Sequence, residues 1–172
     1  MSGVHISIAG LEAIARGMQA APEMARRELL AAMTEAVMLT EREVKERMPR
    51  VSGLTANSIA GDAFSTPAGV LGTVGSSQPS ATFVELGTRP HMPPVDALVP
   101  WVREALGVEP AREREVAFLV ARKIAKHGTR AQRPFALTAQ AVQGQITRLF
   151  EDAAARIAAH LAQSAPAAGG DA

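Results

Sequence analysis

The chain has 172 residues, of which 47% are hydrophobic and 20% charged, a composition that suits one folded domain with a real core. Its formal net charge of +1 gives no long-range attraction to nucleic acid or to acidic substrates. Without cysteine there are no disulfides, no thiol chemistry and no sulfur ligands for zinc. No signal peptide begins the sequence, and no run reaches the roughly 18 apolar residues of a membrane span, so we expect a soluble protein without membrane contact.

A strand and two helices are expected first. Apolar residues alternate with others over positions 4–9, the period of a half-buried strand. Residues 11–18 have helical spacing and predict a short helix. From Pro22 to Met48 neither Gly nor Pro interrupts the chain, which predicts one long helix. Its apolar stripe runs at spacings of three and four through Leu29, Met33, Ala36, Thr40 and Val44.

A small β-hairpin is expected next. Ser52-Gly53 is a turn signal that leads to Ile59. Residues from Phe64 to Ser77 then predict two strands on either side of a turn at positions 67–69.

Helices account for most of the C-terminal half. Spacing and the positions of Gly and Pro predict four of them, at residues 79–86, 97–106, 110–127 and 135–161. The apolar face of the third is expected to hold Val116, Leu119, Val120 and Ile124, and that of the last Val142, Ile146, Leu149, Ala153, Ile157 and Leu161. A proline-dense connector at 89–94 excludes regular structure, and residues 164–172 are expected to form a disordered tail.

Together these elements predict an α+β fold. A long helix in the N-terminal half and a C-terminal helix are expected to pack on a small antiparallel β-sheet, with a helical insertion over residues of about 93–127. We expect a single domain over residues 1–163.

The first candidates for chemistry are Glu85 and His91, as metal ligands or as an acid–base pair. A zinc site usually needs about three protein ligands. The histidines at positions 5, 127 and 160 lie in unrelated segments without ligand spacing. The sequence also has no nucleophile-elbow, Walker A or dinucleotide-binding glycine motif. We therefore expect no catalytic residue, no metal and no cofactor.

Several short motifs occur in an order typical of one family. Phe83-Val84-Glu85-Leu86-Gly87-Thr88 resembles the aromatic-Val-Glu-Phe/Leu-Gly-Thr signature of the phage tail-completion family, the minor tail or neck proteins of long-tailed phages and prophages. Upstream, Ser52-Gly53-Leu54 followed by Ser58-Ile59 is similar to the family's Thr-Gly-x-Leu-x-x-Ser-Ile element, and the hairpin follows it. Downstream, the segment from Gly128 to Pro134-Phe135 resembles the Gly-Thr…Pro-Phe element before the last helix. The resemblance extends from Pro22 to Leu161.

This resemblance implies a structural virion protein, not an enzyme. It would form a ring, expected to be a hexamer, at the head–tail junction around the DNA exit channel, assembled in the cytoplasm of a bacterial host. Its implied partners are further copies of itself, a head-closure or connector protein, and a tail-tube or terminator protein. A tail terminator or a head-closure stopper of the same machine is the closest alternative. The implied motif or interface residues are Gly53, Leu54, Ile59, Phe83, Glu85, Gly87, Thr88, Arg89, Pro134 and Phe135.

Local chemistry suggests a structural role for the central motif. Gly87 allows the positive φ that ends a helix within one residue. The Thr88 hydroxyl is expected to bond to nearby backbone in the turn. Glu85 is expected to pair with Arg89 or with an Arg of a neighbouring subunit.

A basic run without acidic residues is the second candidate site. It comprises Arg122, Lys123, Lys126, His127, Arg130 and Arg133. One interpretation is a solvated helix end, where cations also oppose the helix dipole. Another is non-specific contact with the phosphates of passing DNA through Arg122, Lys123, Lys126 and Arg130. An alternative of a different class is a DNA-binding protein that uses residues 122–133.

Overall fold

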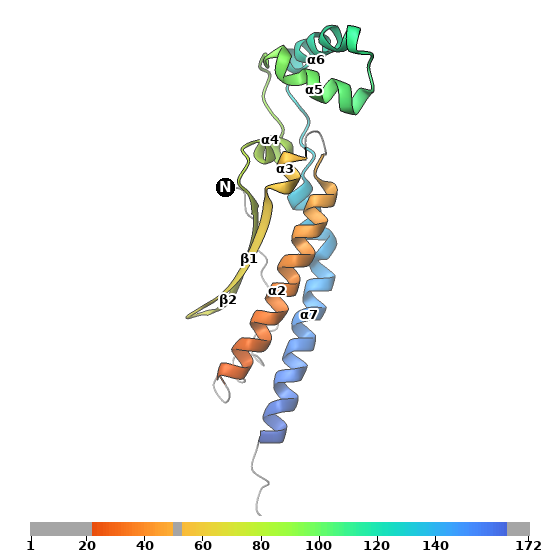
Figure 1. Ribbon diagram of the computed structural model, residues 1–172. Helices are drawn as coiled ribbons and strands as arrows, with labels where there is room; N and C mark the ends of the chain where they lie inside the picture. Colours follow the sequence, from red (N-terminus) through yellow and green to blue (C-terminus); the bar gives the residue numbers. More distant parts are fainter. Residues whose placement is uncertain (1–21, 50–52, 165–172) are drawn as a thin grey trace, which may run out of the picture. The chain divides into compact units, whose positions relative to one another are not determined.

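The computed structural model describes residues 22–49 and 53–164 (Figure 1). In chain order its elements are α2 (Pro22–Arg47), α3 (Leu54–Asn57), β1 (Ile59–Thr66), β2 (Gly69–Ser76), α4 (Ser80–Leu86), α5 (Val95–Leu106), the 3-10 helix η1 (Pro110–Arg112), α6 (Glu113–His127) and α7 (Pro134–Ser164). The strand and short helix predicted before residue 22 lie outside the described residues. So does the predicted tail, apart from Ser164, which is the last residue of α7.

The predicted α+β class is confirmed: long α2 and C-terminal α7 pack with a two-stranded antiparallel sheet, and α5 and α6 form an added helical segment. The described residues divide into two compact units. The first unit contains residues 42–49, 53–60 and 75–138, and the second unit contains residues 22–41, 61–74 and 139–164. No helix within the described ranges combines the length and apolarity that a membrane span requires.

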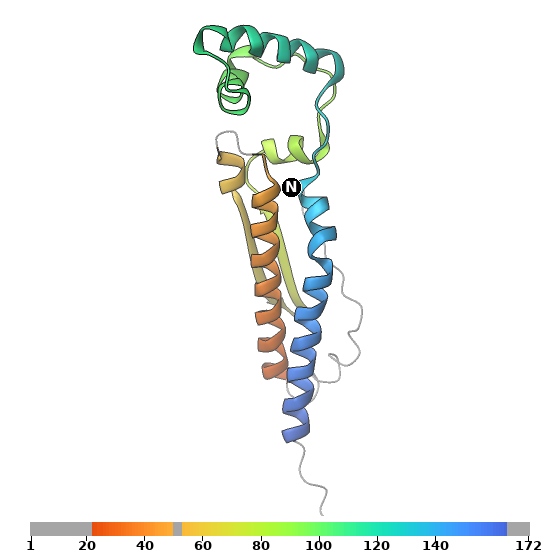
Figure 2. The ribbon, with the colours of Figure 1, turned by 90° about the vertical axis from the view of Figure 1, so that its right-hand side faces the viewer.

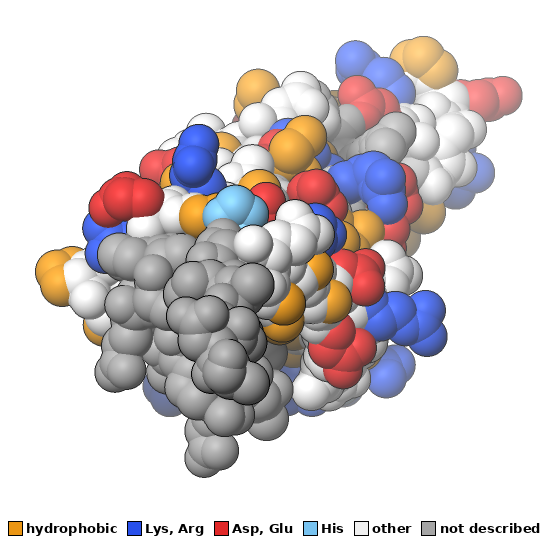
Figure 3. Space-filling view, turned by 90° about the horizontal axis from the view of Figure 1, so that it is seen from below, with side chains coloured by type: hydrophobic (Ala, Val, Ile, Leu, Met, Phe, Trp, Pro, Cys, Tyr) orange, Lys and Arg blue, Asp and Glu red, His pale blue; other side chains and the backbone are white. Residues whose placement is uncertain are grey.

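The core of the second unit lies between α2 and α7, which run side by side in opposite directions (Figures 1 and 2). The residues buried there are Ala25, Leu29, Ala32, Ala36, Val142, Ile146, Phe150, Ala153 and Ile157. Most of them belong to the two predicted stripes, but Phe150 does not, and the predicted Met33, Leu149 and Leu161 are only partly buried. The small alanines let the helices approach closely, since packed helix axes lie about 8–10 Å apart depending on the side chains between them. Beside this core, Nε of Arg156 lies 2.7 Å from Oε2 of Glu28. Acidic and basic side chains are interspersed on the face seen in Figure 3.

The hairpin packs against α2 through two glycines. A Cβ atom at Gly72 would lie 2.6 Å from Sδ of Met33 and 2.7 Å from Cγ2 of Val37, well inside van der Waals contact. Gly61 on β1 likewise faces Val37, and its N–H donates to Oε2 of Glu41 at 2.9 Å. The predicted start at Phe64 is wrong, because β1 begins at Ile59. Strand pairing and packing on α2 therefore extend β1 through residues of low β propensity.

The helical predictions hold in position, with one correction to a buried face. Helix α4 ends at Gly87 as expected, and α7 covers the whole predicted C-terminal helix. In α6, however, Leu119 is exposed, and the fully buried positions are Ala117 and Ala121. Small alanines at the contact let α5 and α6 approach closely. The side of α6 that faces α5 is therefore the alanine side, and Leu119 lies outside the contact.

We expect Gly72→Ala to lower the free energy of unfolding by about 1–3 kcal/mol, because the added methyl displaces Met33 and Val37. Gly75→Ala on the same strand is the matched control. A Cβ there meets no atom within 4 Å, so its effect stays below about 1 kcal/mol. Urea unfolding measures both, and equal costs would contradict the close packing of β2 on α2.

Candidate functional site

The site is organised by the carboxylate of Glu85, which is buried although Phe83 and Leu86 of the same helix are exposed. Its Oε2 accepts the backbone N–H of Phe135 at 2.8 Å, and its Oε1 accepts the N–H of Ala136 at 3.1 Å. These N–H groups belong to the first turn of α7, where no intrahelical acceptor exists and the dipole favours a negative charge. Glu85 thus supplies the N-terminal cap of α7 from a helix 50 residues earlier in the chain.

The segment before α7 is shaped to receive this cap. Pro134 is the first residue of α7 and is fully buried, and its missing N–H costs nothing at that position. Arg133, just before it, has a φ of 57°, a left-handed conformation that is rare for a residue other than Gly. The N–H of Gln132 donates to the carbonyl of Val84 at 2.9 Å, which satisfies one of the free carbonyls at the end of α4.

A short antiparallel bridge joins the ends of α4 and α6. The backbone N–H groups of Thr88 and Thr129 each donate to the other residue's carbonyl at 3.2 Å, and their hydroxyl oxygens lie 3.1 Å apart. Gly87 and Gly128 precede them with φ of 72° and 69°. Neither glycine tolerates a Cβ, because each packs against backbone atoms of the opposite segment.

The upstream element joins the same unit through α3. Gly53 has a φ of 71° and its carbonyl accepts the N–H of Asn57 at 2.8 Å, which starts the single-turn helix. The hydroxyls of Thr55 and Ser80 are 2.8 Å apart, so α3 touches the first residue of α4. Ile59, at the end of this element, is 1% exposed. The described residues of the three motif segments therefore belong to one compact unit.

Three large apolar residues of these motifs are exposed. Phe83 is 58% exposed, Leu86 67% and Leu54 65%, while Glu85 between the first two is 8% exposed. This is the reverse of the usual burial order, in which carboxylates are outside and large apolar side chains inside. Folding of the chain accounts for the burial of Glu85 through the α7 cap, but it leaves Phe83 and Leu86 facing solvent.

Two contacts predicted within the chain are wrong, and the alternative pairing of Glu85 with an Arg of a neighbouring subunit stays a prediction. Glu85 does not pair with Arg89 in the described part of the chain: its carboxylate accepts the two α7 N–H groups, and Arg89 is exposed. The Thr88 hydroxyl accepts the N–H of Thr129, 41 residues away, and not an N–H of its own turn. The signal that sequence reasoning missed is the tripeptide Gly-Thr-Arg, which occurs at both 87–89 and 128–130.

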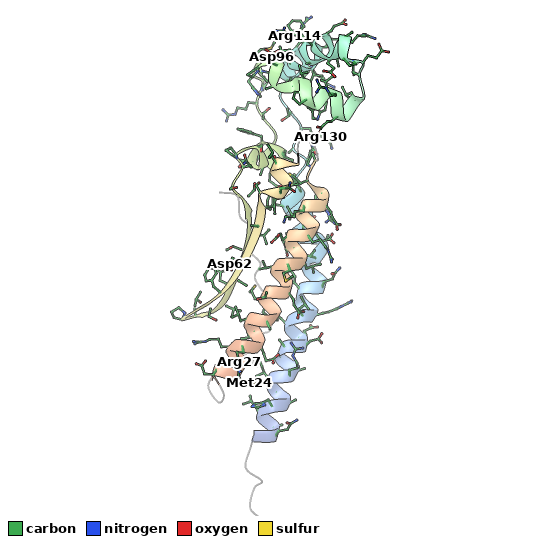
Figure 4. The ribbon with its side chains drawn as sticks, in the orientation of Figure 1. Met24, Arg27, Asp62, Asp96, Arg114 and Arg130 are labelled. Atoms are coloured by element: carbon green, nitrogen blue, oxygen red, sulfur yellow. The ribbon has the colours of Figure 1, made fainter. Side chains whose placement is uncertain are left out.

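The basic run lies on α6 and on the segment that follows it. Arg122, Lys123, Lys126, Arg130 and Arg133 are all exposed, and within the described ranges none of them forms an ion pair. Figure 4 shows Arg130 on the segment between α6 and α7. Among the described residues, no group of three His, Asp or Glu side chains is placed to hold a metal ion.

Comparison with known proteins gives no relative: the chain matches no protein-family model, no curated protein and no solved structure.

Removing the Glu85 carboxylate should destabilise the protein. We expect Glu85→Ala to cost about 2–3 kcal/mol, because two N–H groups of α7 lose a charged acceptor, and Glu85→Gln to cost about 1 kcal/mol less. Glu46→Ala, at an exposed position on α2, is the control and should stay within about 0.5 kcal/mol of the parent protein in urea unfolding. Equal effects at positions 85 and 46 would refute the cap.

The bridge predicts a difference between two glycines that both have positive φ. Gly107→Ala should cost about 1 kcal/mol, because its φ of 58° disfavours a side chain but nothing lies within 4 Å of a new Cβ. Gly87→Ala adds a collision with the 129–131 backbone, including N of Ala131 at 2.8 Å, and should cost about 3 kcal/mol or more. Thermal unfolding of both variants measures the difference, and similar losses would mean that the bridge does not constrain the fold.

Proposed function

We propose that the protein is a structural subunit of a tailed phage or prophage-like particle, a tail-completion or neck ring subunit at the head–tail junction. The observation that carries this proposal is the meeting of the tail-completion motifs around Glu85. The Phe83-to-Thr88 motif and the Gly128-to-Phe135 motif are joined by the α7 cap and by the Thr88–Thr129 bridge. Residues that resemble two motifs of one family thus contact each other directly, as expected if the two motifs share a structural role.

Contact with another subunit would explain why Phe83 and Leu86 are exposed. Phe83 and Leu86 lie three residues apart on α4, so they share one side of the helix. Aromatic and large apolar side chains that are exposed in a monomer are typical of protein–protein contacts. In a ring, one surface patch of each subunit meets a different patch on the next. We assign Phe83 and Leu86 to one such patch.

A related role in the same machine is the nearest alternative. A tail terminator or a head-closure stopper also works as a ring, and it would use the same exposed apolar patch. The partner distinguishes them, since a terminator caps the tail tube whereas a stopper binds the connector.

A DNA-binding protein is the second candidate. The unpaired cations of α6 and of the segment after it favour it, since phosphate contacts need exposed positive charge. If the protein is a DNA-binding protein, isolated monomers should bind duplex DNA with an affinity that falls steeply as the salt concentration rises. If it is a ring subunit, it should make at most weak, non-specific contact with DNA that passes through the channel.

Electron microscopy of the purified full chain, alone and mixed with a tail-tube protein, tests the proposal. Closed rings or capped tubes are the expected result. Monomers at all concentrations, with salt-sensitive binding of duplex DNA, would replace the ring reading with the DNA-binding one.

We expect the double variant Phe83→Ser, Leu86→Ser to lose rings while its free energy of unfolding stays within about 1 kcal/mol of the parent protein, because both side chains are exposed before assembly. Met38→Ser removes another exposed apolar side chain, 65% exposed on α2, and should leave rings intact. Sedimentation velocity measures assembly. Rings that persist in the double variant would remove α4 from the interface.

A further inference from the structure

Many charged side chains of the helical insertion formed by α5, η1 and α6 form ion pairs with one another. Nε and Nη2 of Arg103 donate to the two carboxylate oxygens of Glu113 at 2.7 and 2.8 Å. This fork joins α5 to α6 and holds the pKa of Glu113 below its ordinary value, because Arg103 hydrogen-bonds to the charged carboxylate. Nε of Arg114 lies 3.5 Å from Oδ1 of Asp96, and both residues are labelled in Figure 4. Arg112 and Glu115 form a third pair at 3.6 Å.

The charges that remain are separated by sign along the insertion. Glu104 and Glu109 lie near the junction of α5 and η1, are exposed, and form no ion pair within the described ranges. Leu106, between them, is 50% exposed. We call these three residues the acidic end.

The opposite charge gathers on the second half of α6. Arg122, Lys123 and Lys126 are exposed and are likewise without ion pairs in the described part of the chain. Phe118 and Leu119 lie one turn before Arg122 and Lys123 and are 47% and 54% exposed. Helical spacing puts these five residues on the side of α6 away from Ala117 and Ala121, which face α5. We call them the basic face.

We infer that the basic face of one copy of this chain binds the acidic end of the next copy, so that the insertions join neighbouring subunits head to tail. The inference rests on the proposed function and names an interface within it. Two features of the insertion indicate that a second copy of this chain is the partner. The unpaired charges at the two places have opposite sign, and each place also exposes large apolar side chains.

The two surfaces differ, so the contact is heterologous, the kind that closes rings. Duplex DNA would use the three cations, but its phosphates would leave Phe118 and Leu119 without a role. Because the unpaired charges are exposed, the contact should weaken with added salt over the range where the Debye length shortens from about 10 to 3 Å.

Charge reversal at each surface tests the inference. The acidic-end variant is Glu104→Lys, Glu109→Lys, and the basic-face variant is Arg122→Glu, Lys123→Glu, Lys126→Glu. Each variant alone brings like charges together, and we expect its self-association, measured by sedimentation velocity, to weaken by about a hundredfold or more. Glu46→Lys, Glu151→Lys changes the net charge as much as the acidic-end variant does at two exposed positions elsewhere, and should assemble like the parent protein.

Mixing the two reversed variants is the decisive step. In a one-to-one mixture every contact between alternating copies is again complementary, so mixed assemblies should form although neither variant assembles alone. Misfolded variants would not regain assembly, and fluorescence of the single Trp101, in α5, reports whether each insertion is folded.

The outcomes separate this inference from the proposed function. Rings that form equally well in both reversed variants would overturn the inference and leave the ring proposal standing. Loss of assembly without rescue on mixing would also overturn it, as would a basic-face variant that forms normal rings but loses DNA binding. A parent protein that never self-associates would overturn the proposed function itself.

Discussion

The hydrogen bonds from the first turn of α7 to Glu85 are the constraint on which the first compact unit depends. Without them α7 would begin with two N–H groups lacking an acceptor, one of them buried, and a carboxylate would be buried without a partner. Either alone is unfavourable, and each satisfies the other. The same contact holds α4 against the start of α7, which brings Gln132 within reach of Val84 and lets Thr88 and Thr129 pair.

Much of the fold could be predicted because the chain marks its own element boundaries. Pro22 opens α2, Gly87 and Gly107 end helices with positive φ, and apolar stripes at spacings of three and four identify the buried sides of α2 and α7. Local rules failed where a contact came from elsewhere in the chain. Strand β1 starts at Ile59 because β2 and α2 support it, and Ala117 and Ala121 are buried in place of Leu119 because α5 approaches closely.

The candidate site shows the same limit. The motif residues could be selected from the sequence, and their order along the chain was informative. The hydrogen bonds that Glu85 accepts could not be predicted from the sequence. Its carboxylate binds the start of a helix 50 positions away, and no periodicity relates positions 85 and 135. The repeated Gly-Thr-Arg was a usable signal, because two glycines that end helices before identical residues suggest two segments that cross closely.

The Thr88–Thr129 bridge also affects which changes the segment between these two residues can tolerate. It joins residues that are 41 positions apart in the chain, where two backbone hydrogen bonds and two side-chain contacts hold the ends of the loop together. The entropy of closing a flexible loop rises only slowly with length, by about 0.6 kcal/mol for each doubling. The bridge therefore leaves the length and surface chemistry of the α5–α6 segment free to change without disturbing the Glu85 cap.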